Sequence, residues 1–137
     1  MLSLSTYTRN AILETITTSL IDATTDATLV MFTGQRPSSP DMAYSGDKLI
    51  SFKMSKPSFA PATSGAAVAY DIQPLSNVLI DGEATWFRIY DGNGVPILDG
   101  EISDADGSGD ILLNNTNMTT DGKVSFTRLV MKMPVGI

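Results

Sequence analysis

Short hydrophobic runs separated by turn sequences fill most of this chain, and this pattern limits the folds that it can adopt. Asp and Gly accept the backbone conformations that tight turns need, whereas β-branched and aromatic residues favour strands. The pair Asp-Gly occurs five times, at 81–82, 91–92, 99–100, 106–107 and 121–122. Many short strands at such spacing are typical of a β-sandwich or barrel. We therefore predict a mainly β protein, an antiparallel sandwich or barrel of about seven strands.

The segment from Ala84 to Ile102 has the clearest hairpin pattern, with Asp91-Gly-Asn-Gly94 as its turn. The other expected strands are 28–33, buried on both faces, 48–54, 66–73, 111–113 and 123–133. In the hairpin, Phe87 and Ile89 face one side of the strand, whereas Trp86, Arg88 and Tyr90 face the other side. We expect one face to pack on the core and the other on a neighbouring molecule. Trp86 and Tyr90 are therefore interface candidates, with burial of Trp86 in the core as the alternative.

One helix precedes the strands. Ala11, Ile12, Leu13, Ile16 and Leu20 recur at helical spacing, which predicts a helix over 9–21 that starts as early as Tyr7. Ser5 or Thr6 is the expected N-cap.

Before the helix, residues 1–8 form a possible N-terminal arm. Leu2, Leu4 and Tyr7 alternate with serines, so this arm can add a strand to a neighbouring subunit. A frayed terminus is the alternative. The expected organisation is one domain, 1–137, with the arm at 1–8, the helix at 9–21 and the β-sandwich at 27–133.

Composition argues against several functions. The chain of 137 residues has no Cys and no His, which removes disulfides, thiolate metal sites and the commonest general base. Its net charge is -6 and its nine basic residues are scattered, so nucleic acid is not expected as a partner. No apolar run approaches the roughly 20 residues of a membrane span, and the N-terminus lacks the features of a secretory signal. We expect a soluble, non-enzymatic protein without a cofactor.

Two short motifs are candidates for chemical sites. Ser45-Gly-Asp-Lys48 has the spacing of a serine–lysine pair, but it lies in a polar loop instead of at the start of an apolar helix. Asp104, Asp106 and Asp110 are spaced closely enough to bind calcium. The alternative is a solvated hairpin loop, since the sequence departs from the EF-hand pattern.

The order of motifs resembles a family. The motifs are Arg9-Asn-Ala11, Phe32-Thr-Gly-Gln-Arg-Pro37, Ala84-Thr-Trp-Phe-Arg-Ile89, Ile97-Leu-Asp-Gly100 and Asp121-Gly122. Over residues 7–133 the chain resembles small virion structural proteins of tailed bacteriophages, some of which are capsid decoration or cement proteins. The resemblance implies no catalytic residues. It implies two partners: the major capsid protein, and other copies of this chain in a trimer. The expected location is the capsid surface of the virion, after synthesis in the host cytoplasm.

Two other functions remain open at this point. One is a head–tail joining, collar or tail component of the virion. The other is a small sugar- or calcium-binding β-sandwich module that attaches to host surfaces.

Overall fold

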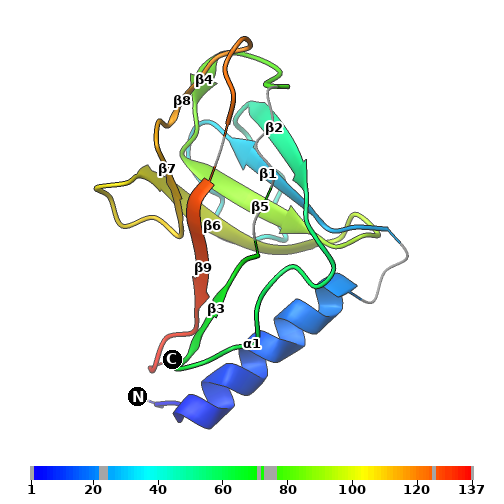
Figure 1. The fold of residues 1–137 in the computed structure, drawn as a ribbon, viewed down its shortest axis with the longest axis vertical. Helices are drawn as coiled ribbons and strands as arrows, with labels where there is room; N and C mark the ends of the chain where they lie inside the picture. Colours follow the sequence, from blue (N-terminus) through cyan, green and yellow to red (C-terminus); the bar gives the residue numbers. More distant parts are fainter. Residues whose placement is uncertain (1, 22–24, 71, 73–76, 125, 137) are drawn as a thin grey trace.

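The described part of the chain forms one helix and nine strands (Figure 1). The computed structural model describes residues 2–21, 25–70, 72, 77–124 and 126–136. The elements are α1 (Thr6–Ile21), β1 (Thr28–Phe32), β2 (Lys48–Lys53), β3 (Ala66–Val68), β4 (Gly82–Glu83), β5 (Trp86–Tyr90), β6 (Pro96–Asp104), β7 (Ile111–Leu113), β8 (Asn117–Met118) and β9 (Phe126–Lys132). The prediction of a mainly β fold with one N-terminal helix is confirmed.

Seven strands form one sheet in the order β2-β1-β5-β6-β7-β9-β3, and β4 pairs with β8 in a second, small sheet. Both of these short strands lie outside the segments that we expected to be strands. The predicted strand 66–73 ends at Val68, and its residues 71 and 73 lie outside the described residues. Buried side chains from β1, β2 and β5 and from β7, β9 and β3 belong to the same core, so the sheet encloses it like a sandwich.

One pairing contradicts the prediction of a purely antiparallel arrangement. β6 and β7 run parallel, with Ile102 beside Ile111. A compact loop makes this possible by bringing the chain back next to the strand that it has just left. The Asp110 carboxylate accepts a hydrogen bond from the Glu101 amide at 3.0 Å, and the Gly109 amide donates to Ser103 Oγ at 2.9 Å.

The β5–β6 hairpin forms as predicted. The Asp91 carboxylate accepts hydrogen bonds from the amides of Asn93 and Val95, each at 2.9 Å, and Gly94 adopts a positive φ of 80°. A carboxylate that satisfies two amides explains why Asp begins this turn.

The Asp-Gly pair at 99–100 is not a turn. Gly100 lies within β6 directly opposite Phe87 of β5. A Cβ at Gly100 would lie 2.4 Å from the Phe87 ring. Glycine at this position therefore makes room for an aromatic side chain.

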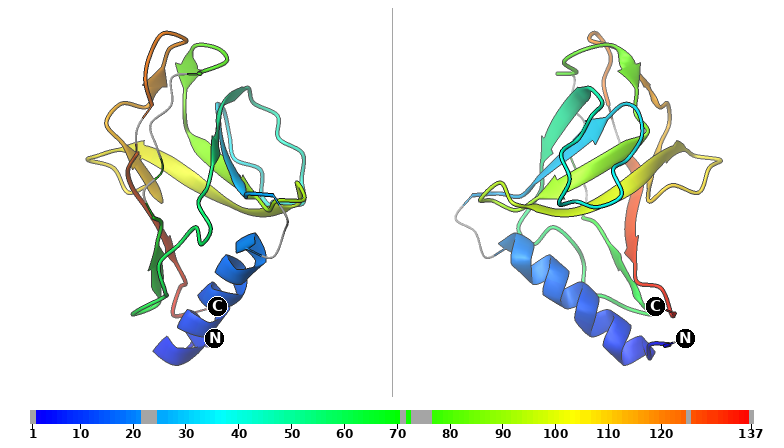
Figure 2. Two further views of the ribbon diagram at one scale, coloured as in Figure 1. Left: turned by 45° about the vertical axis from the view of Figure 1, so that its right-hand side comes forward. Right: turned by 180° about the vertical axis from the view of Figure 1, so that it is seen from behind.

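The helix lies at one end of the β structure (Figure 2), where a narrow apolar strip and two polar contacts hold it. Leu13 and Leu20 are fully buried, whereas the predicted stripe residues Ile12 and Ile16 are half-buried and Ala11 is exposed. Two further contacts tie the helix to the segment before β3: Asn10 Oδ1 accepts from the Gly65 amide at 2.8 Å, and Glu14 Oε1 accepts from the Ala62 amide at 2.6 Å. No helix in the described residues is long and apolar enough to span a membrane.

The N-terminal arm is shorter than predicted. The helix begins at Thr6, and Ser5 is its N-cap, since Ser5 Oγ accepts a hydrogen bond from the Thr8 amide at 3.1 Å. The preceding residues pair with the other end of the same chain: Ser3 forms a bridge with Gly136, and the Leu4 amide donates to the Val135 carbonyl at 2.6 Å. The two termini therefore lie side by side (Figures 1 and 2).

Candidate interaction surfaces and a cleft beside the helix

The loop between β1 and β2 covers the face of the sheet that carries Trp86. The Trp86 ring stacks on Phe32 with centroids 4.3 Å apart, and Tyr44 from the loop packs on Phe32 at 4.6 Å. The indole N–H donates to the Thr33 carbonyl at 3.1 Å. Trp86 is only 1% exposed, so it is a core residue and the interface assignment for it is wrong. Tyr90 is half-buried against the same cluster.

A buried ion pair lies beside Trp86. Arg88 and Asp99 face each other across β5 and β6, with side chains only 3% and 1% exposed. The guanidinium binds the carboxylate through two bonds, Nε–Oδ1 at 2.6 Å and Nη2–Oδ2 at 3.0 Å. The hydrogen bond with Asp99 raises the pKa of Arg88 above its usual value, against the opposing effect of burial. The pair is neutral overall and enclosed, which suits a structural role.

The N-terminal interface candidates fall into two groups. Leu2 is 69% exposed and Tyr7, in the first turn of α1, is 84% exposed. Leu4 is half-buried, and its backbone amide is bonded to the C-terminal segment. Val135 is 54% exposed, and it adds a third exposed apolar side chain to this end of the molecule. We call Leu2, Tyr7 and Val135 the terminal patch.

The structure does not gather the three calcium candidates. Asp104 Oδ1 accepts from the Asp106 amide at 3.1 Å, and the Asp110 carboxylate is bonded to the Glu101 amide. Within the described residues, no group of three acidic side chains is arranged to hold a metal ion. The carboxylates lie in a surface loop, but this loop joins the parallel strands β6 and β7, so it is not the hairpin loop of the alternative.

The serine–lysine motif is exposed at both ends. Ser45 lies in the loop before β2, and Lys48 is the first residue of that strand. A lysine base depends on desolvation to become reactive, and Lys48 is not desolvated.

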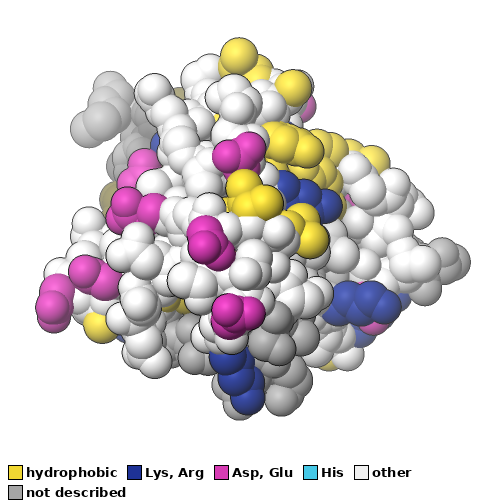
Figure 3. All heavy atoms as spheres, turned by 90° about the horizontal axis from the view of Figure 1, so that it is seen from above, with side chains coloured by type: hydrophobic (Ala, Val, Ile, Leu, Met, Phe, Trp, Pro, Cys, Tyr) yellow, Lys and Arg dark blue, Asp and Glu magenta, His cyan; other side chains and the backbone are white. Residues whose placement is uncertain are grey.

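The acidic residues are concentrated in one part of the chain. The segment 81–121 holds nine of the 15 acidic residues but only one of the nine basic residues, the buried Arg88. Seen from the β4–β8 end, Asp and Glu side chains are spread over the surface (Figure 3). This acidic end of the molecule also carries the exposed apolar residues Leu79 and Ile80, and it lies far from the two termini (Figure 1).

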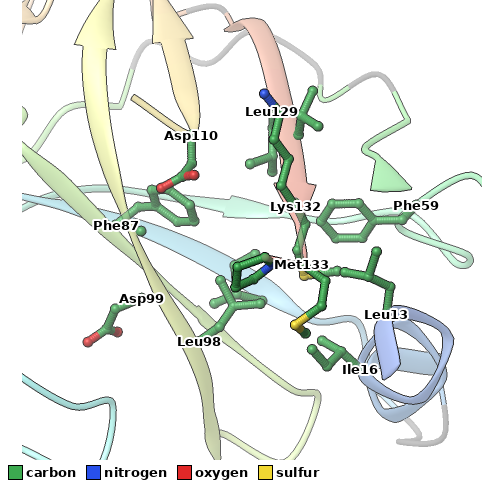
Figure 4. A pocket seen from close by; sticks show the side chains of 15 residues that line it. Leu13, Ile16, Phe59, Phe87, Leu98, Asp99, Asp110, Leu129, Lys132 and Met133 are labelled. Atoms are coloured by element: carbon green, nitrogen blue, oxygen red, sulfur yellow. The ribbon is translucent and has the colours of Figure 1, made fainter. Parts of the chain in front are cut away.

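An apolar cleft of about 210 Å³ opens between α1 and the sheet (Figure 4). Leu13 and Ile16 line it from the helix, Phe87 and Leu98 from β5 and β6, and Met133 from the segment after β9. Sequence reasoning missed this cleft because its lining residues are far apart in the chain. The glycine at position 100 was the available signal, since it marks where a strand makes room for the Phe87 ring.

No protein-family model, no curated protein and no solved structure matches the chain.

Proposed function

We propose that this protein is a virion structural protein that decorates the exterior of a phage capsid. The motif resemblance supports this proposal, and so does the distribution of surface chemistry. The observation that carries it is the separation of the terminal patch from the acidic end of the molecule. A protein that binds a lattice needs one adhesive end, and like charges on the outward end keep particles apart.

The two ends assign an orientation. The terminal patch presents three exposed apolar side chains where the chain ends are joined by backbone hydrogen bonds. Exposed apolar groups of this kind mark contact surfaces. We propose that this end contacts the major capsid protein and neighbouring copies, as a trimer about local threefold sites. The exposed acidic residues of 81–121 then face the solvent.

Cryo-EM of the particles of the virus whose genome encodes this chain tests the proposal. Density for the chain on the outside of the shell, with the termini inward, is the expected result. Density confined to the neck or tail supports a head–tail joining, collar or tail component instead. Particles without any density for the chain refute a virion role.

Mutagenesis tests the orientation separately. The triple variant Leu2→Ser/Tyr7→Ser/Val135→Ser should lose binding to particles in a co-sedimentation assay. The matched control is Leu79→Ser/Ile80→Ser, which removes two exposed apolar residues just before β4, at the opposite end. Loss of binding only in the control would reverse the orientation that we propose.

A second candidate function has one observation in its favour. A polar pocket of about 270 Å³ is lined by Asn115, Asn117, Thr119 and Lys123, with Met118 among its apolar lining. Amide and hydroxyl groups in a concave site can recognise sugar hydroxyls. A glycan array tests this attachment function, and Asn117→Ala should abolish any signal that arises in this pocket.

A further inference from the structure

The first half of β6 has a neighbouring strand on one side only. β5 pairs with β6 from Pro96 to Glu101, whereas β7, on the other side, pairs with it only from Ile102 to Asp104. Among the strands of the described residues, none continues the line of β7 beside the first half of β6. This half therefore has an open edge, and its residues Leu98 and Asp99 line the cleft beside α1 (Figure 4).

The amide directions in β6 identify the groups at this edge. Successive amides of a strand point in alternate directions, and the Ile102 amide faces β5, because it donates to the Thr85 carbonyl at 3.0 Å. The amides of Glu101 and Asp99 therefore face away from β5. The Asp110 carboxylate already accepts the Glu101 amide. The N–H and C=O groups of Asp99 point to the side on which no described strand lies beside them.

Asp99 lines the cleft through its main chain. Its side chain is only 1% exposed, whereas the whole residue is half-buried, so its exposed surface belongs to the backbone. Figure 4 shows the Asp99 carboxylate pointing away from the cleft. The open edge thus offers one backbone donor and one backbone acceptor next to an apolar cleft, which is the arrangement that an added peptide strand recognises.

Ser3 offers the matching pair of groups. Ser3 lies opposite Gly136, but the bond between these two segments runs from the Leu4 amide to the Val135 carbonyl. Because amide directions alternate, the N–H and C=O groups of Ser3 point away from the C-terminal segment. Two residues that face each other in an antiparallel pair can exchange both hydrogen bonds. Ser3 is held beside Gly136 in its own chain, so the Ser3 that meets Asp99 comes from a second copy.

The side chains next to Ser3 suit the cleft. With Ser3 opposite Asp99, both of their side chains lie on the face of the sheet that carries Arg88. The side chain of Leu2 then lies on the other face, where Leu98 lines the cleft. Leu2 is 69% exposed in its own chain. The cleft measures about 210 Å³, and a cavity of ~150 Å³ holds benzene, so a leucine side chain fits.

The charges at the rim neither select nor oppose this occupant. Asp110 and Lys132 carry opposite charges and line the same cleft, so the rim favours neither an anion nor a cation. Residues 2–5 contain no charged side chain. Backbone hydrogen bonds and apolar burial would therefore determine binding.

We propose that residues 2–4 of one copy add a short strand to the open edge of β6 in a second copy, with Ser3 opposite Asp99 and Leu2 in the cleft. The inference goes beyond the decoration function and does not depend on it. The contact joins two different surfaces, so successive copies can close into a ring. Because the contact is small, a peptide with these residues should bind with a dissociation constant on the order of 1 mM.

NMR titration of isotope-labelled protein tests the site with three peptides. Acetyl-Leu-Ser-Leu-Ser-amide, which copies residues 2–5, should saturably shift the amide signals of Asp99 and Gly100 and the methyl signals of Leu98 and Ile16. Acetyl-Leu-Pro-Leu-Ser-amide keeps both leucines but lacks the central N–H group, so it should bind roughly two- to tenfold more weakly. Acetyl-Ser-Ser-Ser-Ser-amide lacks the leucines and should cause no saturable shift.

A pair of helix variants tests the cleft. Ile16→Phe should fill the cleft from α1 and abolish the saturable shifts caused by the leucine peptide. Its control is Ile12→Phe, which changes another half-buried isoleucine of α1 that lies outside the cleft lining. This control should bind the peptide as the wild type does.

A spin label tests the contact between intact copies. The chain has no Cys, so a nitroxide can be attached at one introduced cysteine. Tyr7→Cys carries the label on an exposed residue close to Ser3, and Leu79→Cys carries it on an exposed residue at the opposite end. Each labelled chain is mixed with isotope-labelled wild type. The label at position 7 should broaden the Asp99 amide signal as concentration rises, and the label at position 79 should not.

Four results would overturn the proposal. The first is that the leucine peptide shifts neither the Asp99 nor the Gly100 amide. The second is that the proline peptide binds as tightly as the serine peptide. The third is that folded Ile16→Phe binds the leucine peptide as the wild type does. The fourth is that the label at position 7 broadens the Asp99 signal no more than the label at position 79. The peptide and label experiments remain decisive even if Ile16→Phe does not fold.

Discussion

Removing the guanidinium of Arg88 should cost more stability than any single change to an exposed charged side chain in the described structure. The substitution Arg88→Met keeps an unbranched apolar stem beside Trp86, but it leaves the carboxylate of Asp99 buried without its partner. Breaking a buried ion pair in this way typically costs ~3–5 kcal/mol. For a domain whose total stability is roughly 5–15 kcal/mol, this is a large fraction.

A double-mutant cycle separates the cost of breaking the Arg88–Asp99 pair from a general disruption of packing. In Arg88→Met/Asp99→Leu both charges are gone, and well-packed apolar pairs of this kind are often neutral in stability. We therefore expect the double variant to recover most of the loss. Arg36→Met is the matched surface control. Arg36 and Glu101 are exposed and 3.6 Å apart, so this change should cost less than about 1 kcal/mol.

Urea unfolding, followed by circular dichroism and by the fluorescence of Trp86, measures these free energies with the slope m as a check on two-state behaviour. Trp86 is the only tryptophan in the chain, and its ring centroid lies 5.4 Å from Arg88 Cζ. A loss below about 1 kcal/mol in Arg88→Met, or a double variant no more stable than either single one, would refute the reasoning.

Mutation is the right perturbation here, because a change of pH within the physiological range does not deprotonate Arg88 and so does not break its pair with Asp99. The pKa of Arg88 is raised in the folded protein. A group with a raised pKa contributes stability that is lost only as pH rises through that value. Since the usual pKa of arginine is already far above neutrality, the contribution of Arg88 should be constant across the physiological range.

Three further predictions follow from single contacts. Gly100→Ala should lower stability by about 1–3 kcal/mol, because the added Cβ meets the Phe87 ring; an unchanged melting temperature would contradict this. Asn10→Ala should cost about 1 kcal/mol and speed hydrogen exchange at the Gly65 amide, which loses its acceptor; unchanged exchange at that amide would show that the contact does not hold the helix. Calcium or EDTA should leave the melting temperature unchanged, since the carboxylates of Asp104 and Asp110 accept backbone amides and the three acidic side chains of this loop are not gathered around one site; a calcium-dependent rise would restore the calcium hypothesis.

The elements that were predicted well depend on local chemistry. β1 and the β5–β6 hairpin follow from side-chain type and from the turn chemistry of Asp91 and Gly94, which act over a few residues. The helix and its serine cap are local in the same sense. A period of two or of 3.6 residues is visible in sequence because neighbouring positions alone create it.

Other elements depend on residues far apart in the chain. The alternating pattern of residues 2–7 suits pairing with any available strand, and only the tertiary structure brings it to the C-terminal segment. Trp86 would be a plausible interface residue on an open strand, but the loop that carries Tyr44 covers it. The Asp-Gly pair at 99–100 has the composition of a turn, but the position of Phe87 on the next strand places it within β6.

The sequence by itself therefore determined a mainly β protein with one helix at its N-terminus, since periodicity and turn residues act locally. The tertiary structure decided which faces are covered, how the parallel β6–β7 pair forms, and where the cleft beside α1 lies. These features arise when segments separated by tens of residues come into contact. Their geometry depends on which side chains contact each other, and the local sequence pattern does not specify contacts between distant residues.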